Sequence, residues 1–125
     1  MIVRKKVLIV DDDPMVLKVT RKVLEAAGYE VITHPMSYGT SALILRELPD
    51  IVLLDVVMDG LPGNEIVDVI HSSRLLENRN ISFVFFTGNP DVNLEELASQ
   101  DGVVGIIEKT ADSAEFLRKF IQITS

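Results

Sequence analysis

Aspartate side chains end two apolar stretches of the sequence, and they are the first residues whose positions suggest chemistry. The stretch VLIVDDDP places Asp11 and Asp12 directly after Val7–Val10. The stretch IVLLDVVMDG places Asp55 directly after Ile51–Leu54. A carboxylate at the end of a buried segment costs free energy unless its charge is used. Acids that meet from two such segments repel one another and raise one another's pKa unless a cation lies between them.

The available side chains indicate which cation and which reaction would suit these acids. The chain has no cysteine, and oxygen ligands without histidine or cysteine favour Mg²⁺ over zinc or copper. Two more polar groups follow apolar stretches, the hydroxyl of Thr87 and the ammonium of Lys109. Both groups can hold phosphoryl oxygens. A carboxylate nucleophile, a divalent metal, a lysine and a hydroxyl are sufficient for phosphoryl transfer onto an aspartate.

The order of the predicted elements brings these residues to one edge of a sheet. Five short apolar runs alternate with helix-like segments, at residues 6–10, 29–33, 51–54, 81–86 and 102–107. Four runs are nearly continuously apolar, which is typical of parallel strands covered on both faces, whereas run 29–33 alternates and is expected at an edge. The pattern predicts an α/β fold with a doubly wound five-stranded parallel sheet and helices on both faces. Ligands bind such sheets beyond the carboxyl ends of the strands, where the acids, Thr87 and Lys109 all lie.

Capping residues and apolar periodicity predict the helices between these strands. Asp13 and Pro14 are expected to open the first helix, and later helices are expected over 40–48, from about 64, over 93–102 and from 112. Apolar residues at helical spacing predict one buried stripe on the first helix, at Val16, Val19 and Val23. A similar stripe is predicted on the third helix, at Ile66, Val69 and Ile70.

Length and charge limit the classes of function. The 125 residues, 13.9 kDa in mass, amount to one domain, which we expect to span residues 1–125. No apolar run approaches the ~20 residues that span a bilayer, and the N-terminal run does not have the form of a signal peptide. The absence of cysteine fits a reducing cytoplasm, which is the expected location. The net charge of −7, from 12 basic and 19 acidic residues, argues against direct nucleic-acid binding.

These residues together resemble the receiver domain of two-component response regulators, along the whole chain. The matching features are an acidic pair after the first strand, a lone aspartate after the third, a threonine after the fourth and a lysine after the fifth. Any one of them is a weak signal, but the combination is specific. The resemblance implies a flavodoxin-like fold with strand order 2-1-3-4-5.

The resemblance also implies a metal site. Asp12 would bind Mg²⁺ directly, and Asp11 would contribute through water. Asp55 and the backbone carbonyl of Val57 would be further ligands. Asp13 is expected to cap the first helix instead of binding the metal.

For the phosphoryl group, the resemblance assigns three residues. Asp55 would accept the group from a histidine kinase or a phosphotransfer protein, Thr87 would contact it, and Lys109 would pair with it or with Asp55. Gly63 matches the glycine usual after the phosphoacceptor loop. Such a domain catalyses only its own phosphorylation and dephosphorylation, so it is not an enzyme with a separate substrate. A downstream protein would dock on the fourth helix, the fifth strand and the fifth helix, and phosphorylation could also drive homodimerisation.

Three positions depart from the family pattern. Asp59 stands where a proline is usual, and Thr110 replaces the proline that usually follows the lysine. Ile106 occupies the position of an aromatic switch residue. These departures concern signalling output more than metal or phosphoryl chemistry. They leave open a pseudo-receiver that binds partners without phosphorylation-driven switching.

An enzyme is the other alternative. The VLIVDDDP stretch also fits haloacid-dehalogenase-like phosphatases, with Asp11 as nucleophile and Asp13 as acid. That family needs a further acidic motif after the lysine, and this interpretation gives no role to Asp55.

Overall fold

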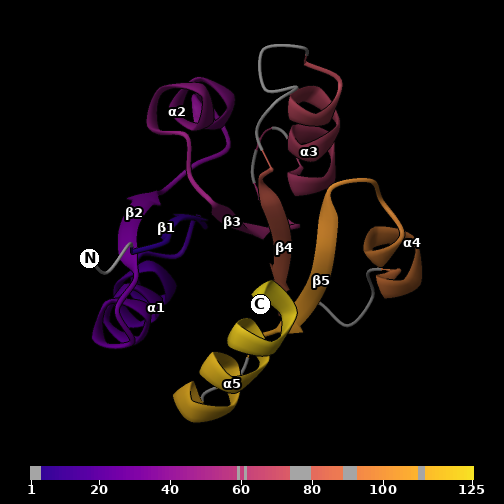
Figure 1. The fold of residues 1–125 in the computed structure, drawn as a ribbon. Helices are drawn as coiled ribbons and strands as arrows, with labels where there is room; N and C mark the ends of the chain where they lie inside the picture. The colour runs from indigo at the N-terminus through magenta and orange to yellow at the C-terminus, as the bar shows by residue number, and fades with distance from the viewer. Residues whose placement is uncertain (1–3, 59, 61, 74–79, 89–92, 110–111) are drawn as a thin grey trace.

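A parallel sheet of five strands forms the centre of the structure, a computed structural model that describes residues 4–58, 60, 62–73, 80–88, 93–109 and 112–125 (Figure 1). The strands are β1 (Lys6–Val10), β2 (Glu30–His34), β3 (Ile51–Asp55), β4 (Ser82–Thr87) and β5 (Val103–Glu108). The helices are α1 (Pro14–Ala26), α2 (Thr40–Glu47), α3 (Gly63–His71), α4 (Leu94–Ala98) and α5 (Ser113–Thr124). The strand order β2-β1-β3-β4-β5 confirms the predicted doubly wound fold. Asp59 and Thr110, two departures from the family pattern, lie outside the described residues.

Strand register determines which residues meet at the carboxyl edge of the sheet. Val10 at the end of β1 pairs with Leu54 of β3. The next residue of each chain segment, Asp11 after β1 and Asp55 at the end of β3, therefore lies beside the other at the edge of the sheet. Thr87, the last residue of β4, pairs with Glu108 of β5, which immediately precedes Lys109 in the chain.

Each face of the sheet carries its own hydrophobic core. On one face, side chains of β1, β3 and β4 pack against α2 and α3, with Ile44, Ile66 and Phe85 fully buried. On the other face, α1 and α5 cover the same strands, with Leu24 and Phe120 fully buried. Alternate residues of one strand point to opposite faces, so the continuously apolar strands supply both cores.

The buried face of α1 is not the one predicted from Val16, Val19 and Val23. It is displaced by one residue, which is a rotation of about 100° around a helix with 3.6 residues per turn. The buried residues are Leu17, Thr20 and Leu24, whereas Val19 is 45% exposed. The other two valines of the predicted stripe are partly buried and flank this face. Leu17 and Leu24 thus lie on the buried face, and Val16 and Val23 line its margin.

Two other predicted helices differ in detail. On α3 the buried side chains include Ile66, Val67 and Ile70, but Val69 is 50% exposed. α4 ends at Ala98, earlier than predicted, because a turn at residues 99–102 precedes β5. The caps themselves are confirmed, with Asp13 accepting from the backbone N–H of Met15 at 2.9 Å.

β5 is less covered than its sequence suggests. It forms the edge of the sheet opposite β2, and Val104 is 47% exposed. Run 102–107 thus lies at an edge although it is nearly continuously apolar, as the implied strand order 2-1-3-4-5 requires. None of the helices in the described ranges has the length and hydropathy needed to cross a membrane.

Candidate functional site

Three carboxylates gather at the carboxyl edge of the sheet. Oxygen atoms of Asp11, Asp12 and Asp55 all lie within 4.8 Å of one another. Asp11 and Asp55 are 1% and 5% exposed, whereas Asp12 is exposed to solvent. The two buried acids come from the ends of β1 and β3, so the convergence predicted from the sequence is present.

The ammonium of Lys109 lies directly on the two buried acids. Its Nζ is 2.7 Å from Oδ2 of Asp11 and 3.2 Å from Oδ2 of Asp55. The same Nζ lies 5.6 Å from the centre of the Phe86 ring, a distance at which a cation is attracted to the face of an aromatic ring. The sequence predicted the contact with Asp55 but neither the shorter contact with Asp11 nor the role of Phe86. The strand register could have indicated the contact with Phe86. Phe86 pairs with Ile107 of β5, and Ile107 and Lys109 are two positions apart, so their side chains point to the same side.

Charge crowding changes the proton affinity of this site. The pKa of Asp55 is raised, first by burial and then by the negative charge of Asp11, and the attraction of Lys109 offsets this only in part. Burial alone would lower the pKa of Lys109, but its close contact with the negative charge of Asp11, together with the charge of Asp55, raises it. The site therefore holds more negative charge than one ammonium compensates.

A divalent cation would suit this arrangement. The three clustered groups offer oxygen ligands only, which is the donor set preferred by Mg²⁺. Oδ2 of Asp11 is buried and makes no hydrogen bond of good angular geometry, although the Lys109 ammonium is close to it. A buried carboxylate oxygen of this kind gains from a ligand that supplies positive charge.

The turn after β3 supports the Asp55 carboxylate through the backbone. The N–H of Val57 donates to Oδ1 of Asp55 at 3.2 Å, and the Val57 side chain is exposed. Gly63 opens α3 directly against this turn. A Cβ at Gly63 would lie 2.5 Å from the carbonyl oxygen of Asp55, so the close approach requires glycine. The sequence pattern matched Gly63, and this contact gives the physical reason.

Thr87 occupies the same sheet edge at the end of β4. It is 2% exposed, and its carbonyl oxygen accepts a 2.7 Å hydrogen bond from the backbone N–H of Lys109. Ile106, at the position of the aromatic switch residue, is partly buried and packs against the core on the α3 side of the sheet.

Other candidate residues lie apart from the acids. The Asp13 carboxylate caps α1, and its backbone N–H donates to Oδ1 of Asp11. The ring of His34 contacts the carbonyl oxygen of Tyr38, and His71 is an exposed residue beside Gly102. In the described part of the chain neither histidine forms an ion pair.

A doubly wound parallel sheet with three acids and a lysine at its carboxyl edge is the arrangement expected of a receiver-like α/β domain. Within that class the assignment is direct, because the family model for the response regulator receiver domain matches residues 7–121. The chain belongs to this family and is a receiver domain of the two-component type.

Individual relatives agree with this assignment. The chain is 38% identical over 120 residues to the positive alginate biosynthesis regulatory protein of Pseudomonas aeruginosa, covering 90% of this chain and 46% of that protein. It is 31% identical over 117 residues to the CAI-1 autoinducer sensor kinase/phosphatase CqsS of Vibrio cholerae, covering 92% of this chain and 17% of that protein. The chain thus spans less than half of the length of either relative.

A solved structure shows the same fold. The crystal structure of a CheY-like response regulator receiver domain protein from Methanospirillum hungatei superimposes with a TM-score of 0.83 at 25% sequence identity. The match covers 98% of this chain and 94% of that one.

Proposed function

We propose that this receiver domain accepts a phosphoryl group on Asp55 from a phosphohistidine of a histidine kinase or phosphotransfer protein, with Mg²⁺ as cofactor. The observation that carries the proposal is the cluster of Asp11, Asp12 and Asp55 with the Lys109 ammonium on its two buried members. Membership of the receiver family indicates the class of reaction. Within the cluster, Asp55 is the nucleophile and the Lys109 ammonium provides positive charge beside it.

In the proposed reaction the Asp55 carboxylate is the nucleophile. One carboxylate oxygen attacks phosphorus, a new O–P bond forms, and the P–N bond to the donor imidazole breaks. The electron pair of that bond returns to the imidazole nitrogen, which takes up a proton from solvent. Before transfer, Oδ1 accepts from the Val57 N–H and Oδ2 contacts Lys109, so the carboxylate is held in one orientation. Fixed orientation lowers the entropic part of the barrier.

The cation would be held by Asp11, Asp12 and Asp55, with the backbone carbonyl of Val57 as a further ligand. Bound Mg²⁺ would supply the positive charge that offsets the incoming phosphoryl oxygens. Lys109 would pair with an oxygen of the transferred phosphoryl group, and it can keep its contact with Asp11 while it does so. The Thr87 hydroxyl would contact another phosphoryl oxygen from the end of β4.

The partners follow from the same reaction. A histidine kinase or phosphotransfer protein is the donor, and the match of this chain to part of a sensor kinase/phosphatase supports such an association. We further propose that a downstream protein docks on α4, β5 and α5, that phosphorylation can promote homodimers, and that the protein works in the cytoplasm. On this account the domain turns over no separate metabolite, and it binds no nucleic acid directly.

A second candidate is a receiver that docks without a phosphorylation-driven switch. The observation that favours it is Ile106, which is partly buried and has neither ring nor hydroxyl to exchange between two positions. A β-branched side chain on a strand has few rotamers available. Docking would then depend on the folded surface alone.

Intact-mass analysis after treatment with acetyl phosphate tests the proposed function. With Mg²⁺ the wild-type protein should gain the mass of one phosphoryl group, and with a chelator it should gain none. Asp55→Asn should abolish the gain, while the control Asp13→Asn, which changes a neighbouring acid outside the cluster, should keep it. Labelling of Asp55→Asn at the wild-type level would overturn the assignment.

A further inference from the structure

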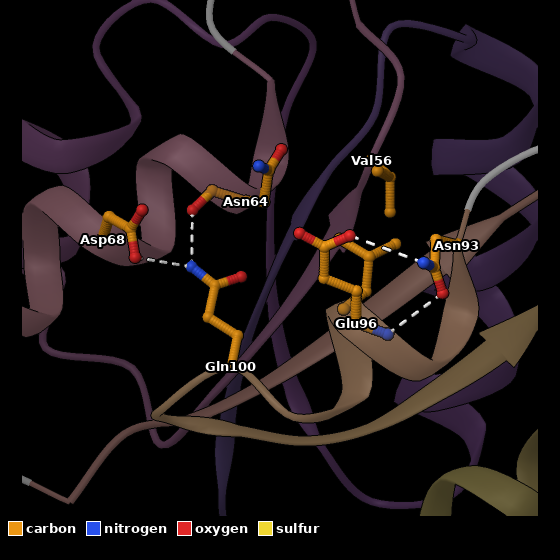
Figure 2. A pocket seen from close by; sticks show the side chains of 7 residues that line it. Val56, Asn64, Asp68, Asn93, Glu96 and Gln100 are labelled. Atoms are coloured by element: carbon orange, nitrogen blue, oxygen red, sulfur yellow. Dashed lines mark hydrogen bonds between the residues drawn. The ribbon is translucent and has the colours of Figure 1, made fainter.

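A pocket of about 420 Å³ opens between α3 and α4, and none of the clustered aspartates is among the residues that line it (Figure 2). Val56 and Leu97 supply apolar surface, and the remaining lining residues are polar: Asn64, Asp68, Asn93, Glu96 and Gln100. The two carboxylates lie on opposite helices, Asp68 on α3 and Glu96 on α4. The pocket therefore combines apolar surface with one carboxylate from each of two helices.

Hydrogen bonds hold both walls of the pocket in place. Nε2 of Gln100 donates to the carbonyl oxygen of Asn64 and to Oδ1 of Asp68, each at 2.7 Å (Figure 2). On the other wall, Oδ1 of Asn93 accepts from the backbone N–H of Glu96 at 3.2 Å. The contacts of both carboxylates within the pocket are with neutral amides, Asp68 with Gln100 and Glu96 with Asn93.

The net negative charge of the chain comes from the segment that contains the pocket residues, 51–102. Residues 51–102 contain nine Asp or Glu and two Arg, so their net charge is −7, equal to that of the whole chain. The rest of the sequence is balanced, with ten acidic and ten basic residues. Among the described residues of this segment, Glu65 and Asp68 lie on α3, Glu95 and Glu96 lie on α4, and no Lys or Arg is present. A basic group is thus attracted to these two helices, because a concentrated charge of one sign steers ligands of the other sign.

Of the acids that the structure describes in this segment, only Asp55 takes part in an ion pair, the one with Lys109. The salt bridges across all the described residues involve the acids Asp11, Glu25, Glu47, Asp55 and Glu115. No described basic residue pairs with Asp68 or Glu96. The pocket offers two carboxylates whose present partners are neutral.

We propose that the α3–α4 pocket binds an arginine or lysine side chain from a basic segment of a partner protein. The aliphatic stem of such a side chain can lie on Leu97 and Val56, while its cationic end pairs with Glu96 and Asp68. Charge complementarity selects this occupant, because the pocket offers two carboxylates and apolar surface. A divalent cation suits the pocket less well, since the acid cluster of metal-binding geometry in the described residues is Asp11, Asp12 and Asp55.

The chain offers a matched pair of variants for a test. Glu95 and Glu96 are adjacent exposed residues of α4, and Glu96 lines the pocket whereas Glu95 does not. Glu95→Gln and Glu96→Gln therefore remove the same charge from the same helix. Gln at position 96 also keeps an acceptor for the Asn93 side chain, so the cap is preserved.

The experiment is an NMR titration of unphosphorylated protein with N-acetyl-arginine amide, with the uncharged N-acetyl-citrulline amide as control ligand. We expect saturable shifts at Val56, Asn64, Leu97 and Gln100 with the arginine ligand and smaller, non-saturating shifts with citrulline. Glu96→Gln should raise Kd about two- to fivefold, and Glu95→Gln should leave it near the wild-type value.

Two outcomes would overturn the proposal. Equal weakening by both variants would mean that the acidic field attracts the ligand without a pocket. Shifts that never saturate, or that citrulline reproduces, would mean that no cation site exists there. Because the protein is not phosphorylated in this titration, neither outcome bears on the role of Asp55.

Discussion

The ammonium of Lys109 lies 3.2 Å from Oδ2 of Asp55, although 54 positions of sequence separate the two residues. They come from the ends of β5 and β3, with β4 between them in the sheet. The lysine stem therefore crosses the end of β4, where it passes over Gly88 and its Nζ lies near the ring of Phe86. Because the same Nζ also contacts Asp11, one cation joins the ends of three strands.

Replacing Asp55 should stabilise the fold at neutral pH. The pKa of Asp55 is raised, first by burial and then by the charge of Asp11, so the folded state binds its proton more tightly than the unfolded state does. Stability from this group is present at low pH and is lost as the pH rises through the raised pKa. In the absence of metal, Asp55→Asn should increase the free energy of unfolding at pH 7 by on the order of 1 kcal/mol.

Urea unfolding at several pH values measures this effect. The gain from Asp55→Asn should shrink as the pH falls below the raised pKa, since wild-type Asp55 is then protonated and neutral. A variant less stable than the wild type at pH 7 would show that attraction by Lys109 outweighs the burial and the repulsion.

Gly63 should tolerate no larger side chain. A Cβ there would lie 2.5 Å from the backbone oxygen of Asp55 and 3.2 Å from Cγ of Leu54. Backbone atoms cannot move aside cheaply, so we expect Gly63→Ala to cost about 1–3 kcal/mol of unfolding free energy. Gly88→Ala is the matched control, because its nearest neighbour would be a Lys109 side-chain atom at 3.5 Å. Equal stability of the two variants in urea unfolding would contradict the close approach.

Removal of one exposed acid should abolish most Mg²⁺ binding. Asp12 is the exposed member of the cluster, so Asp12→Ala should weaken binding with little change to the buried core. Asp13→Ala should cost about 1 kcal/mol of stability through the lost cap of α1, yet leave Mg²⁺ affinity unchanged.

The pH dependence of Mg²⁺ binding has a definite sign. Protons compete with the metal for carboxylates, and Asp55 binds its proton with a raised pKa. Affinity should therefore fall as the pH decreases through that pKa, and calorimetric titration at a series of pH values measures it. Wild-type affinity in Asp12→Ala would place the metal elsewhere.

Activation should reach α4 through Thr87. In this receiver the partly buried Ile106 cannot supply an aromatic ring movement. A ligand shifts a conformational equilibrium only through contacts that differ between the states. NMR spectra with beryllofluoride and Mg²⁺ should change at Gly88 and at residues 93–100, with smaller changes around Ile106. Thr87→Ala should reduce the changes in 93–100, and changes confined to the acids would instead favour a non-switching binding module.

The buried strands made much of this structure predictable. Parallel strands covered on both faces appear as continuous apolar runs, so the ends of β1 and β3 could be located from the sequence, and with them Asp11 and Asp55. Because parallel strands end at one edge, the convergence of the acids followed from the fold.

The parts that could not be predicted depend on packing between elements. Helical periodicity alone did not distinguish the valine stripe of α1 from the face of Leu17 and Leu24, which differ by one residue. The contact of Lys109 with Asp11 depends on how a long side chain crosses β4. The α3–α4 pocket depends on Gln100, a polar residue in a turn whose hydrogen bonds reach 36 and 32 positions back along the chain.

The most direct test of the proposed phosphoacceptor is to locate the modified residue. Borohydride reduces an acyl phosphate but leaves a carboxylate, a phosphohistidine and a phosphothreonine intact, so it converts a phosphorylated aspartate to homoserine. After treatment with acetyl phosphate and Mg²⁺, followed by borohydride and peptide mass spectrometry, we expect homoserine at position 55 alone. Homoserine at Asp11 or Asp12 with none at position 55, or an unreduced phosphoryl group on His34, His71 or Thr87, would contradict the proposed role of Asp55.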